Sequence, residues 1–173
     1  WFFSQIEAKD SVEIAKALID RAYAFDDQLP SLFVREAHLK TWYSWDLKGA
    51  KTLLKNALET IPNNVEAHMH LSVVMTYLRD LDLAEEHILK CITIDPLSAV
   101  LQFSYAWTMW YKNDLEKCDN IIDKRISFKP RFWGGHYLKA VVCLETQGSE
   151  KALKFAEESA VLYPSSMTYA LVA

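Results

Sequence analysis

The sequence predicts an all-α fold built from repeated helix pairs, and three observations carry this prediction. Pro62, Pro96, Pro130 and Pro164 follow one another at a constant interval of 34 residues. Apolar residues recur at spacings of three and four along most of the chain, as they do on one face of a helix. The 173 residues include only 4 glycines and 5 prolines, which disfavours a β-sandwich with its many tight turns.

Each 34-residue unit is expected to hold two helices separated by a short polar break. The breaks are Trp45-Asp46, Arg79-Asp80, Asn113-Asp114 and Gln147-Gly148. Each proline is expected to end the second helix of its unit, because proline lacks the backbone N–H donor and disfavours helical geometry in the preceding residue. Asn64 and Ser98 suit the start of the helix that follows.

Three columns in the same register indicate where the two helices of a pair cross. They are Ala50, Ala84, Cys118 and Ala152; Ala57, Cys91, Arg125 and Ser159; and Leu54, Ile88, Ile122 and Ala156. Helices approach closely only where a side chain is short, so we expect the small residues to lie at the crossings. Arg125 breaks the pattern, and we expect its helix to pack loosely or its guanidinium to turn outward.

A 34-residue helix pair with small residues at the crossing and a proline at its end resembles the tetratricopeptide repeat. NALETIPNN, from Asn56 to Asn64, and ILKCITIDP, from Ile88 to Pro96, are most similar to the family's helix ends. The expected units are a partial repeat at 1–30, full repeats at 31–64, 65–98, 99–132 and 133–166, and the start of another at 167–173. The resemblance implies a single domain over 1–173, a right-handed superhelical solenoid of antiparallel helix pairs.

A narrower resemblance concerns the turns. Trp45-Asp46-Leu47, the turn from Asp95 to Ser98 and the segment from Phe132 to His136 are similar to repeat arrays attached to bacterial signalling proteins. Those proteins include helix-turn-helix transcriptional regulators and adenylate-cyclase-like proteins, so the resemblance implies a regulatory or scaffold role. The chain begins with Trp1 rather than methionine, and we expect it to be part of a longer polypeptide.

Charge and composition disfavour several classes of function. The net charge of −4 offers no general attraction for phosphate backbones, so we expect no direct binding of nucleic acid. The longest segment without Asp, Glu, Lys or Arg, 96–111, has 16 residues, whereas a membrane-spanning helix needs about 20. Cys91, Cys118 and Cys143 occur singly and form neither a disulfide framework nor a metal motif. We therefore expect reduced thiols in a cytoplasmic protein without a membrane partner.

The resemblance also implies a concave groove lined by the first helix of each repeat. The candidate groove residues are Arg35, Leu39, Trp42, Met69, Val73, Phe103, Trp107, Trp110, Tyr111 and Tyr137. Only Arg35 resembles the basic and amide residues with which chaperone-binding members hold the terminal carboxylates of a peptide. An amphipathic helix or an extended apolar segment suits the rest better, with Trp and Tyr as anchors. Aromatic residues at helical spacing also serve packing, and both roles stay open for Phe103, Trp107 and Trp110.

No catalytic or metal-binding pattern is evident in the sequence. His68 and His70 are two residues apart and lie on different faces of a helix, whereas a zinc-binding helix pairs histidines four residues apart. Cys91 and Cys118 fill small-residue columns, so we expect them to be buried and weakly nucleophilic. Nucleophile elbows, phosphate loops and dinucleotide fingerprints are all absent from the sequence. We therefore expect no catalysis, no cofactor and no metal.

Two functions remain. The first is a noncatalytic module that binds a helical or extended apolar segment, supplied by another protein, a flanking domain or a second protomer. The alternative is a small-molecule sensor, in which the groove closes around a ligand and changes the pitch of the superhelix to control an attached effector. Loss of a protein partner on substitution of Phe103, Trp107 and Trp110 would favour the first, and stabilisation by a metabolite would favour the second.

Overall fold

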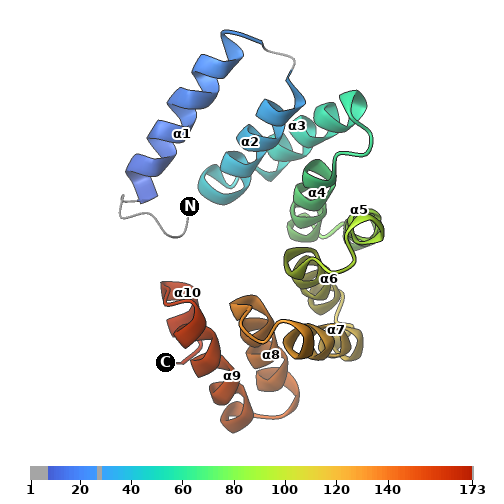
Figure 1. Cartoon of the computed structure of the whole chain (residues 1–173), viewed down its shortest axis with the longest axis vertical. Helices are drawn as coiled ribbons and strands as arrows, with labels where there is room; N and C mark the ends of the chain where they lie inside the picture. Colours follow the sequence, from blue (N-terminus) through green and yellow to red (C-terminus); the bar gives the residue numbers. More distant parts are fainter. Residues whose placement is uncertain (1–7, 27–28, 173) are drawn as a thin grey trace. The chain divides into compact units, whose positions relative to one another are not determined.

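The computed structural model describes residues 8–26 and 29–172, and every regular element within them is helical (Figure 1). In chain order the elements are α1 (Ala8–Tyr23), α2 (Pro30–Leu39), its π-helical continuation η1 (Lys40–Ser44), α3 (Leu47–Thr60), α4 (Val65–Tyr77), α5 (Leu81–Ile94), α6 (Ala99–Tyr111), α7 (Leu115–Phe128), α8 (Trp133–Thr146), α9 (Ser149–Leu162) and α10 (Ser166–Tyr169). The predicted all-α class is confirmed. None of the described helices has the length and apolar character required to cross a bilayer.

The helix boundaries repeat at the predicted interval. The second helices of the four repeats, α3, α5, α7 and α9, begin at Leu47, Leu81, Leu115 and Ser149, 34 residues apart, and each ends two residues before its proline. The prolines therefore mark the ends of these helices, as expected from their restriction of the preceding residue. Residues 1–7, 27 and 28 of the expected first partial repeat, and residue 173 of the last, lie outside the described residues.

A residue with left-handed backbone geometry separates the two helices of each repeat. These residues are Trp45 (φ 54°), Arg79 (φ 64°), Asn113 (φ 61°) and Gly148 (φ 94°). The predicted breaks are confirmed, but in the fourth repeat Gly148 takes this geometry rather than Gln147, whose φ is −129°. A positive φ after the last helical turn reverses the chain direction, which lets the second helix fold back on the first.

Side-chain caps explain where several helices begin. Asn64 accepts a hydrogen bond from the backbone N–H of Ala67 at 3.0 Å, and Ser98 accepts one from Leu101 at 3.5 Å, as the sequence predicts. Asp46 and Asp114 cap α3 and α7 in the same way. The first N–H groups of a helix have no acceptor within the helix, so such caps stabilise its first turn.

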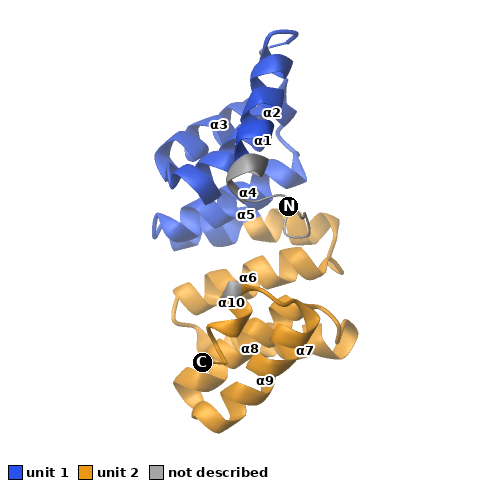
Figure 2. Cartoon of the chain, turned by 90° about the vertical axis from the view of Figure 1, so that its left-hand side faces the viewer, with its two compact units in different colours: residues 1–87 blue, residues 88–173 orange. Residues whose placement is uncertain are grey.

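The chain forms two compact units, residues 1–87 and residues 88–173 (Figure 2). The boundary falls within α5. The single domain expected over 1–173 stays a prediction.

The core of unit 1 lies where α2 packs on α3 and α3 packs on α4. Its buried residues are Val34, Ala37, Ala50, Leu54, Ala57, Ala67, Leu71, Val74, Met75 and Ala84. The small residues predicted at the crossings, Ala50, Ala57 and Ala84, have no exposed surface, which confirms the columns in this unit.

The core of unit 2 lies among α6, α7 and α8, and α9 packs on α8. Its buried residues are Ala106, Met109, Cys118, Ile122, Leu138 and Val142. Lys139 is also buried and holds α8 to α7, because its Nζ lies 2.7 Å from Asp119 Oδ1 and 2.6 Å from Asp123 Oδ1. A buried ammonium paired with two carboxylates avoids most of the cost of an isolated buried charge.

The structure contradicts the expectation for Arg125. The predicted loose packing or outward-turned guanidinium is wrong, because the residue is only 8% exposed. Its Nη1 donates a hydrogen bond of 3.0 Å to the carbonyl oxygen of Leu97, in the turn before α6. Ser159, at the same repeat position, donates to the carbonyl of Trp133 at 3.2 Å. Polar residues in this column therefore fasten the second helix to the start of a first helix.

Candidate functional site

Unit 2 carries a continuous set of aromatic side chains, which we call the aromatic cluster: Phe103, Trp107, Trp110, Tyr111, Phe132, Trp133, Tyr137 and Tyr163. Trp107 lies at its centre, with ring centroids 5.9 Å from Phe103, 5.2 Å from Trp110, 5.7 Å from Tyr111 and 6.2 Å from Tyr137. Trp133 continues the series, 6.1 Å from Tyr137 and stacked on Tyr163 at 5.0 Å. These separations are typical of favourable aromatic pairs.

Helical spacing and a close crossing bring these rings together. Phe103, Trp107 and Trp110 share one face of α6, and Trp133 and Tyr137 share one face of α8, which packs against α6. Gly134 has no side chain where the two helices meet. A Cβ atom there would lie 3.0 Å from Phe103 Cδ2 and 2.9 Å from Phe132 Cε1, closer than such contacts allow. Glycine therefore lets the two phenyl rings approach the backbone of α8.

The aromatic cluster is partly core and partly surface. Phe103, Trp107 and Trp110 pack against the buried core of unit 2, but each keeps some exposed area, as does Tyr137. Tyr163 is 7% exposed and anchors one end of the cluster. Burial raises the pKa of Tyr137, with a further contribution from Tyr111, so the Tyr137 hydroxyl stays neutral at ordinary pH. Five of the predicted groove residues, Phe103, Trp107, Trp110, Tyr111 and Tyr137, are thus brought together in this unit.

The other five predicted groove residues lie in unit 1, and they differ from one another in exposure and in contacts. Leu39 is only 6% exposed and lies beneath the surface. Met69 and Val73 are half-buried on α4. Arg35 is exposed but is already paired, because its Nη1 lies 2.7 Å from Glu66 Oε1. Trp42 is 46% exposed and is the member of this group with a large free aromatic surface.

Sequence reasoning missed a second aromatic group, formed by Trp42, Trp45 and Tyr77. The Tyr77 ring lies 5.9 Å from Trp42, edge to face, and 5.2 Å from Trp45. Trp45 is 60% exposed and has the left-handed φ of 54°, which is uncommon for a bulky residue. It follows the π-helical turn η1, a kind of irregularity often found at functional sites. The available signal was a Trp at the break position that holds Arg79 and Asn113 in the next repeats.

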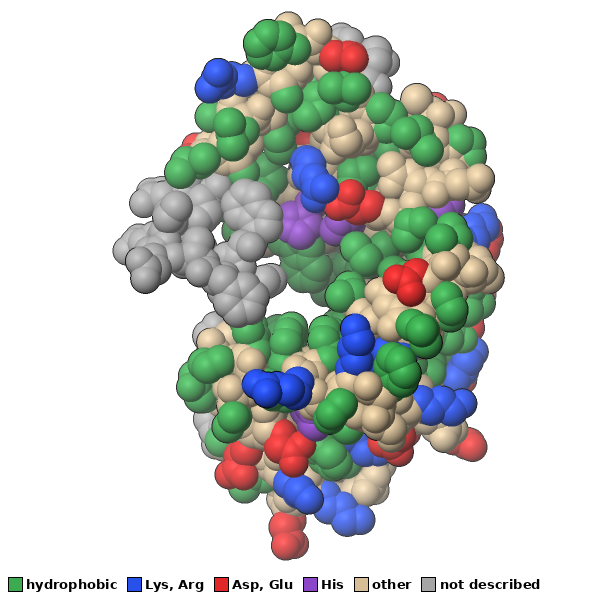
Figure 3. Space-filling model, in the orientation of Figure 1, with side chains coloured by type: hydrophobic (Ala, Val, Ile, Leu, Met, Phe, Trp, Pro, Cys, Tyr) green, Lys and Arg blue, Asp and Glu red, His purple; other side chains and the backbone are tan. Residues whose placement is uncertain are grey.

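A polar group lies beside this aromatic group on α2 and α4. The His38 ring is 5.1 Å from that of His70, and Glu66 Oε1 is 3.9 Å from His70 Nε2. Burial, together with the charges of His70 and Arg35, lowers the pKa of His38 to about 4. In Figure 3, histidine side chains lie next to a basic and an acidic side chain in the half of the view that holds unit 1. His38 is therefore neutral at ordinary pH.

The remaining histidines and the cysteines have structural surroundings. Nε2 of His68 is 2.9 Å from the carbonyl oxygen of Pro62, and Nε2 of His136 is 2.7 Å from that of Pro130, so both rings fasten the turn that ends the preceding repeat. Burial raises the pKa of Cys91 to about 11 and that of Cys118 to about 12, which confirms that these thiols are weakly nucleophilic. Within residues 8–26 and 29–172, no three His, Cys, Asp or Glu side chains gather as a metal site.

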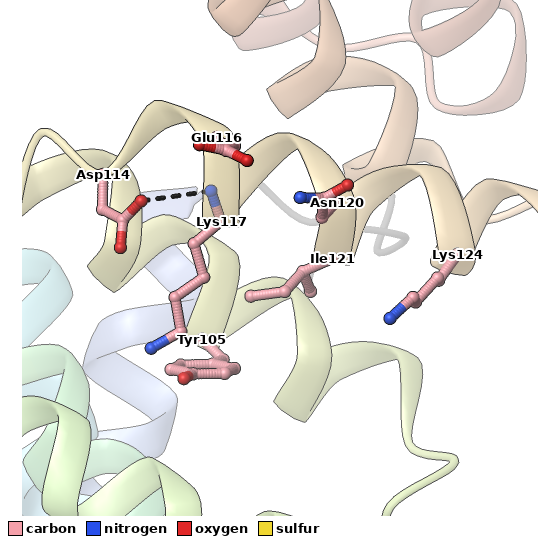
Figure 4. Close-up of a pocket in the computed structure, with 7 residues that line it drawn as sticks. All are labelled: Tyr105, Asp114, Glu116, Lys117, Asn120, Ile121 and Lys124. Carbon is pink, nitrogen blue, oxygen red and sulfur yellow. Dashed lines mark hydrogen bonds between the residues drawn. The ribbon is translucent and has the colours of Figure 1, made fainter.

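Two cavities in unit 2 lie apart from the aromatic cluster. The larger, of about 450 Å³, is lined by Tyr105, Asp114, Glu116, Lys117, Asn120, Ile121 and Lys124 (Figure 4). Two of its charged residues have structural roles: Asp114 caps α7 through the backbone N–H of Lys117, whose Nζ lies 5.1 Å from the Tyr105 ring. The smaller, of about 300 Å³, is mostly apolar and includes Leu144, Leu153 and Leu171. Neither lining contains a nucleophile paired with a general base.

Neither protein-family models nor curated protein sequences match this chain. Solved structures do. TTC0263, a thermophilic TPR protein of Thermus thermophilus, is similar with a TM-score of 0.79 and 16% identity, over 96% of this chain and 92% of that chain. Pseudomonas aeruginosa PilF has a TM-score of 0.68 and 19% identity, over 84% of this chain and 68% of that chain. An O-GlcNAc transferase of Thermobaculum terrenum has a TM-score of 0.68 and 16% identity, over 78% of this chain but 26% of its own.

At identities of 16 to 19%, these similarities concern the fold. They agree with the 34-residue recurrence of helix boundaries, breaks and prolines in this chain. The predicted class, an all-α solenoid of helix pairs, is confirmed, and the chain has the fold of tetratricopeptide-repeat proteins.

Proposed function

We propose that the chain is a noncatalytic protein-interaction module whose aromatic cluster binds a helical or extended apolar segment of a partner. The observation that carries the proposal is the row of seven partly exposed aromatic side chains in contact with one another on α6 and around α8. They are Phe103, Trp107, Trp110, Tyr111, Phe132, Trp133 and Tyr137. Trp and Tyr are enriched among residues that dominate binding energy, because they bury a large area with few rotatable bonds.

The form of the surface favours a polypeptide ligand over a metabolite. Pockets for small molecules usually enclose most of the ligand surface. The two cavities of about 450 and 300 Å³ are not lined by residues of the aromatic cluster. A row of partly exposed rings suits the apolar face of a helix or the alternate side chains of an extended segment. The sensor hypothesis therefore has the weaker support.

The turns and the cysteines support a regulatory or scaffold role in the cytoplasm. The turns around Trp45, Asp95 and Phe132 resemble those of arrays attached to bacterial regulators and signalling proteins, which suits a regulatory or scaffold segment. Cys91, Cys118 and Cys143 are buried and form no disulfide, which supports a location in the reducing cytoplasm. The partner in this proposal is a protein segment, whether from another chain, a flanking domain or a second protomer.

A test must separate binding from folding, because Trp107 and its neighbours also support the core of unit 2. We would pan a displayed library of 16-residue peptides on the wild-type chain. The affinities of enriched peptides would then be measured for the double variant Trp110→Leu, Tyr137→Leu. Leucine keeps an apolar side chain and part of the volume but removes the flat rings, so circular dichroism should show an intact fold. The matched control is Trp45→Leu in unit 1.

The expected result is a set of peptides with apolar residues at helical or alternating spacing that bind the double variant at least about tenfold more weakly, a loss of about 1.4 kcal/mol. The Trp45→Leu control should bind them normally. Peptides that bind both variants as well as the wild type would show that the aromatic cluster is not the binding surface.

A further inference from the structure

Glu145 places a carboxylate at the edge of the aromatic cluster. It lies in the last turn of α8 and is exposed, and its Oε1 accepts a hydrogen bond of 2.9 Å from Nε1 of Trp110. Among the described residues, no Lys, Arg or His forms an ion pair with Glu145. The carboxylate therefore lies beside the rings without a cationic partner among the described residues.

The position of this charge is unfavourable for the helix itself. The C-terminal end of a helix carries a partial negative charge, so a carboxylate in the last turn is destabilising and a cation is preferred. The last turn of α8 contains no basic residue. Three other carboxylates of unit 2 have structural partners: Asp119 and Asp123 share Lys139, and Asp114 caps α7. Glu145 has no comparable ion pair or capping role.

At the Trp110 end of the aromatic cluster, the charged side chain that contacts a ring is the acidic Glu145. Arg131 precedes Phe132 in the turn before α8, 14 residues from Glu145, which is about 20 Å along the helix. Lys112, which follows α6, is engaged in interactions of its own. A cation brought by a ligand to Glu145 would lie against the Trp110 indole, whose face attracts cations within about 6 Å.

We infer that the partner segment is basic and amphipathic, with a Lys or Arg that pairs with Glu145 and rests on Trp110 while apolar side chains cover Phe103, Trp107 and Tyr137. The inference rests on the proposed function and adds the charge of the ligand. Ion pairs at the rim of an apolar surface select partners and speed their encounter. The net charge of −4 acts in the same direction.

The test uses Glu145→Gln, which keeps an oxygen that accepts from Trp110 but removes the charge. The probes are three 18-residue amphipathic peptides with the same Leu and Trp face, in which the positions flanking that face are all Lys, all Gln or all Glu. Binding is measured by fluorescence anisotropy at low and at physiological ionic strength. Glu116→Gln, which removes one charge from α7 outside the aromatic cluster, is the matched control.

The wild type and Glu116→Gln should bind the Lys peptide about tenfold more tightly than the Gln peptide and should bind the Glu peptide most weakly. Glu145→Gln should lose most of this preference and keep its affinity for the Gln peptide. The preference should shrink as salt is added, because exposed charges are screened.

Equal affinities of the wild type for the Lys and Gln peptides would overturn the inference and leave the interaction module standing. A preference for the Lys peptide that survives unchanged in Glu145→Gln would also overturn the inference, since another residue would then recognise the charge of the peptide. Failure of all three peptides to bind, with enriched library peptides also unaffected by Trp110→Leu and Tyr137→Leu, would instead contradict the proposed function itself.

Discussion

The aromatic residues of the two units are held in different ways. In unit 2, Trp107 contacts four other rings and also packs on the core. In unit 1, Trp42 and Trp45 meet at Tyr77 and remain 46% and 60% exposed. The aromatic residues therefore form a packed surface in unit 2, whereas in unit 1 two tryptophans keep large exposed areas.

The backbone differs as well. In unit 1 the first helix ends in the π-helical turn η1 followed by Trp45 at a φ of 54°, whereas α6 ends regularly before Asn113 at 61°. Asparagine tolerates left-handed geometry better than a bulky side chain does. Rigidity in unit 2 comes from packed rings, while unit 1 combines exposed rings with a strained turn. Four substitutions or conditions test this difference, from the largest expected effect to the smallest.

Trp107→Ala should destabilise unit 2 by about 3 kcal/mol, near the low end for loss of a large aromatic side chain because the ring is partly exposed. Urea denaturation measures the change, and Trp42→Ala is the matched control in unit 1, with an expected cost below about 1 kcal/mol. Equal costs for the two substitutions would mean that the aromatic residues of both units are held alike.

Ala84→Leu should cost about 2 kcal/mol, because Ala84 has no exposed surface at the helix crossing of unit 1 and a larger side chain must push the helices apart. Lys55→Leu adds an apolar side chain at an exposed position of α3 and should change stability little. A neutral result for Ala84→Leu in thermal unfolding would contradict the crossing.

Unit 1 should lose stability as the pH falls from about 6.5 towards 4. The folded-state pKa of His38 is about 4, below the ordinary value of about 6.5, so between these limits the unfolded chain binds a proton that the folded chain does not. The loss attributable to this partly exposed ring should be on the order of 1 kcal/mol after solvent screening. Urea unfolding of the wild type and His38→Gln at pH 7, 5.5 and 4.5 measures it, and parallel curves for the two proteins would refute this assignment.

Trp45→Asn should change the free energy of unfolding by less than about 0.5 kcal/mol. Relief of the positive φ offsets the lost contact with Tyr77, since asparagine adopts this geometry readily. Thermal unfolding followed by circular dichroism is sufficient. A cost above about 2 kcal/mol would show that Trp45 packs as a core residue, like the rings of unit 2.

Local rules explain what could be predicted from the sequence. The prolines and the breaks act on their own neighbours, so the 34-residue register and the helix ends follow from spacing. The columns of small residues predict the helix crossings, because only a short side chain fits where two helices approach closely. The position of Arg125 could not be predicted in this way, because its Nη1 donates a hydrogen bond to the carbonyl oxygen of Leu97, 28 residues earlier.

The candidate site was predictable only in part. The helical spacing of Phe103, Trp107 and Trp110 placed them on one face, but their contacts with Trp133 and Tyr137 depend on how α8 packs on α6. The burial of Leu39 and the pairing of Arg35 with Glu66 likewise depend on neighbouring helices. Trp45 was missed although a Trp stands at the break position, because no sequence pattern distinguishes a π-helical turn from the end of an ordinary helix.

Hydrogen exchange with a bound library peptide tests the central claim most directly, because it reports on both units in one measurement. Binding at the aromatic cluster predicts slower exchange along α6 and α8, with α2, η1 and α4 unchanged. Protection confined to α2, η1 and α4, with none on α6 or α8, would contradict the account and would move the binding surface to the exposed tryptophans of unit 1.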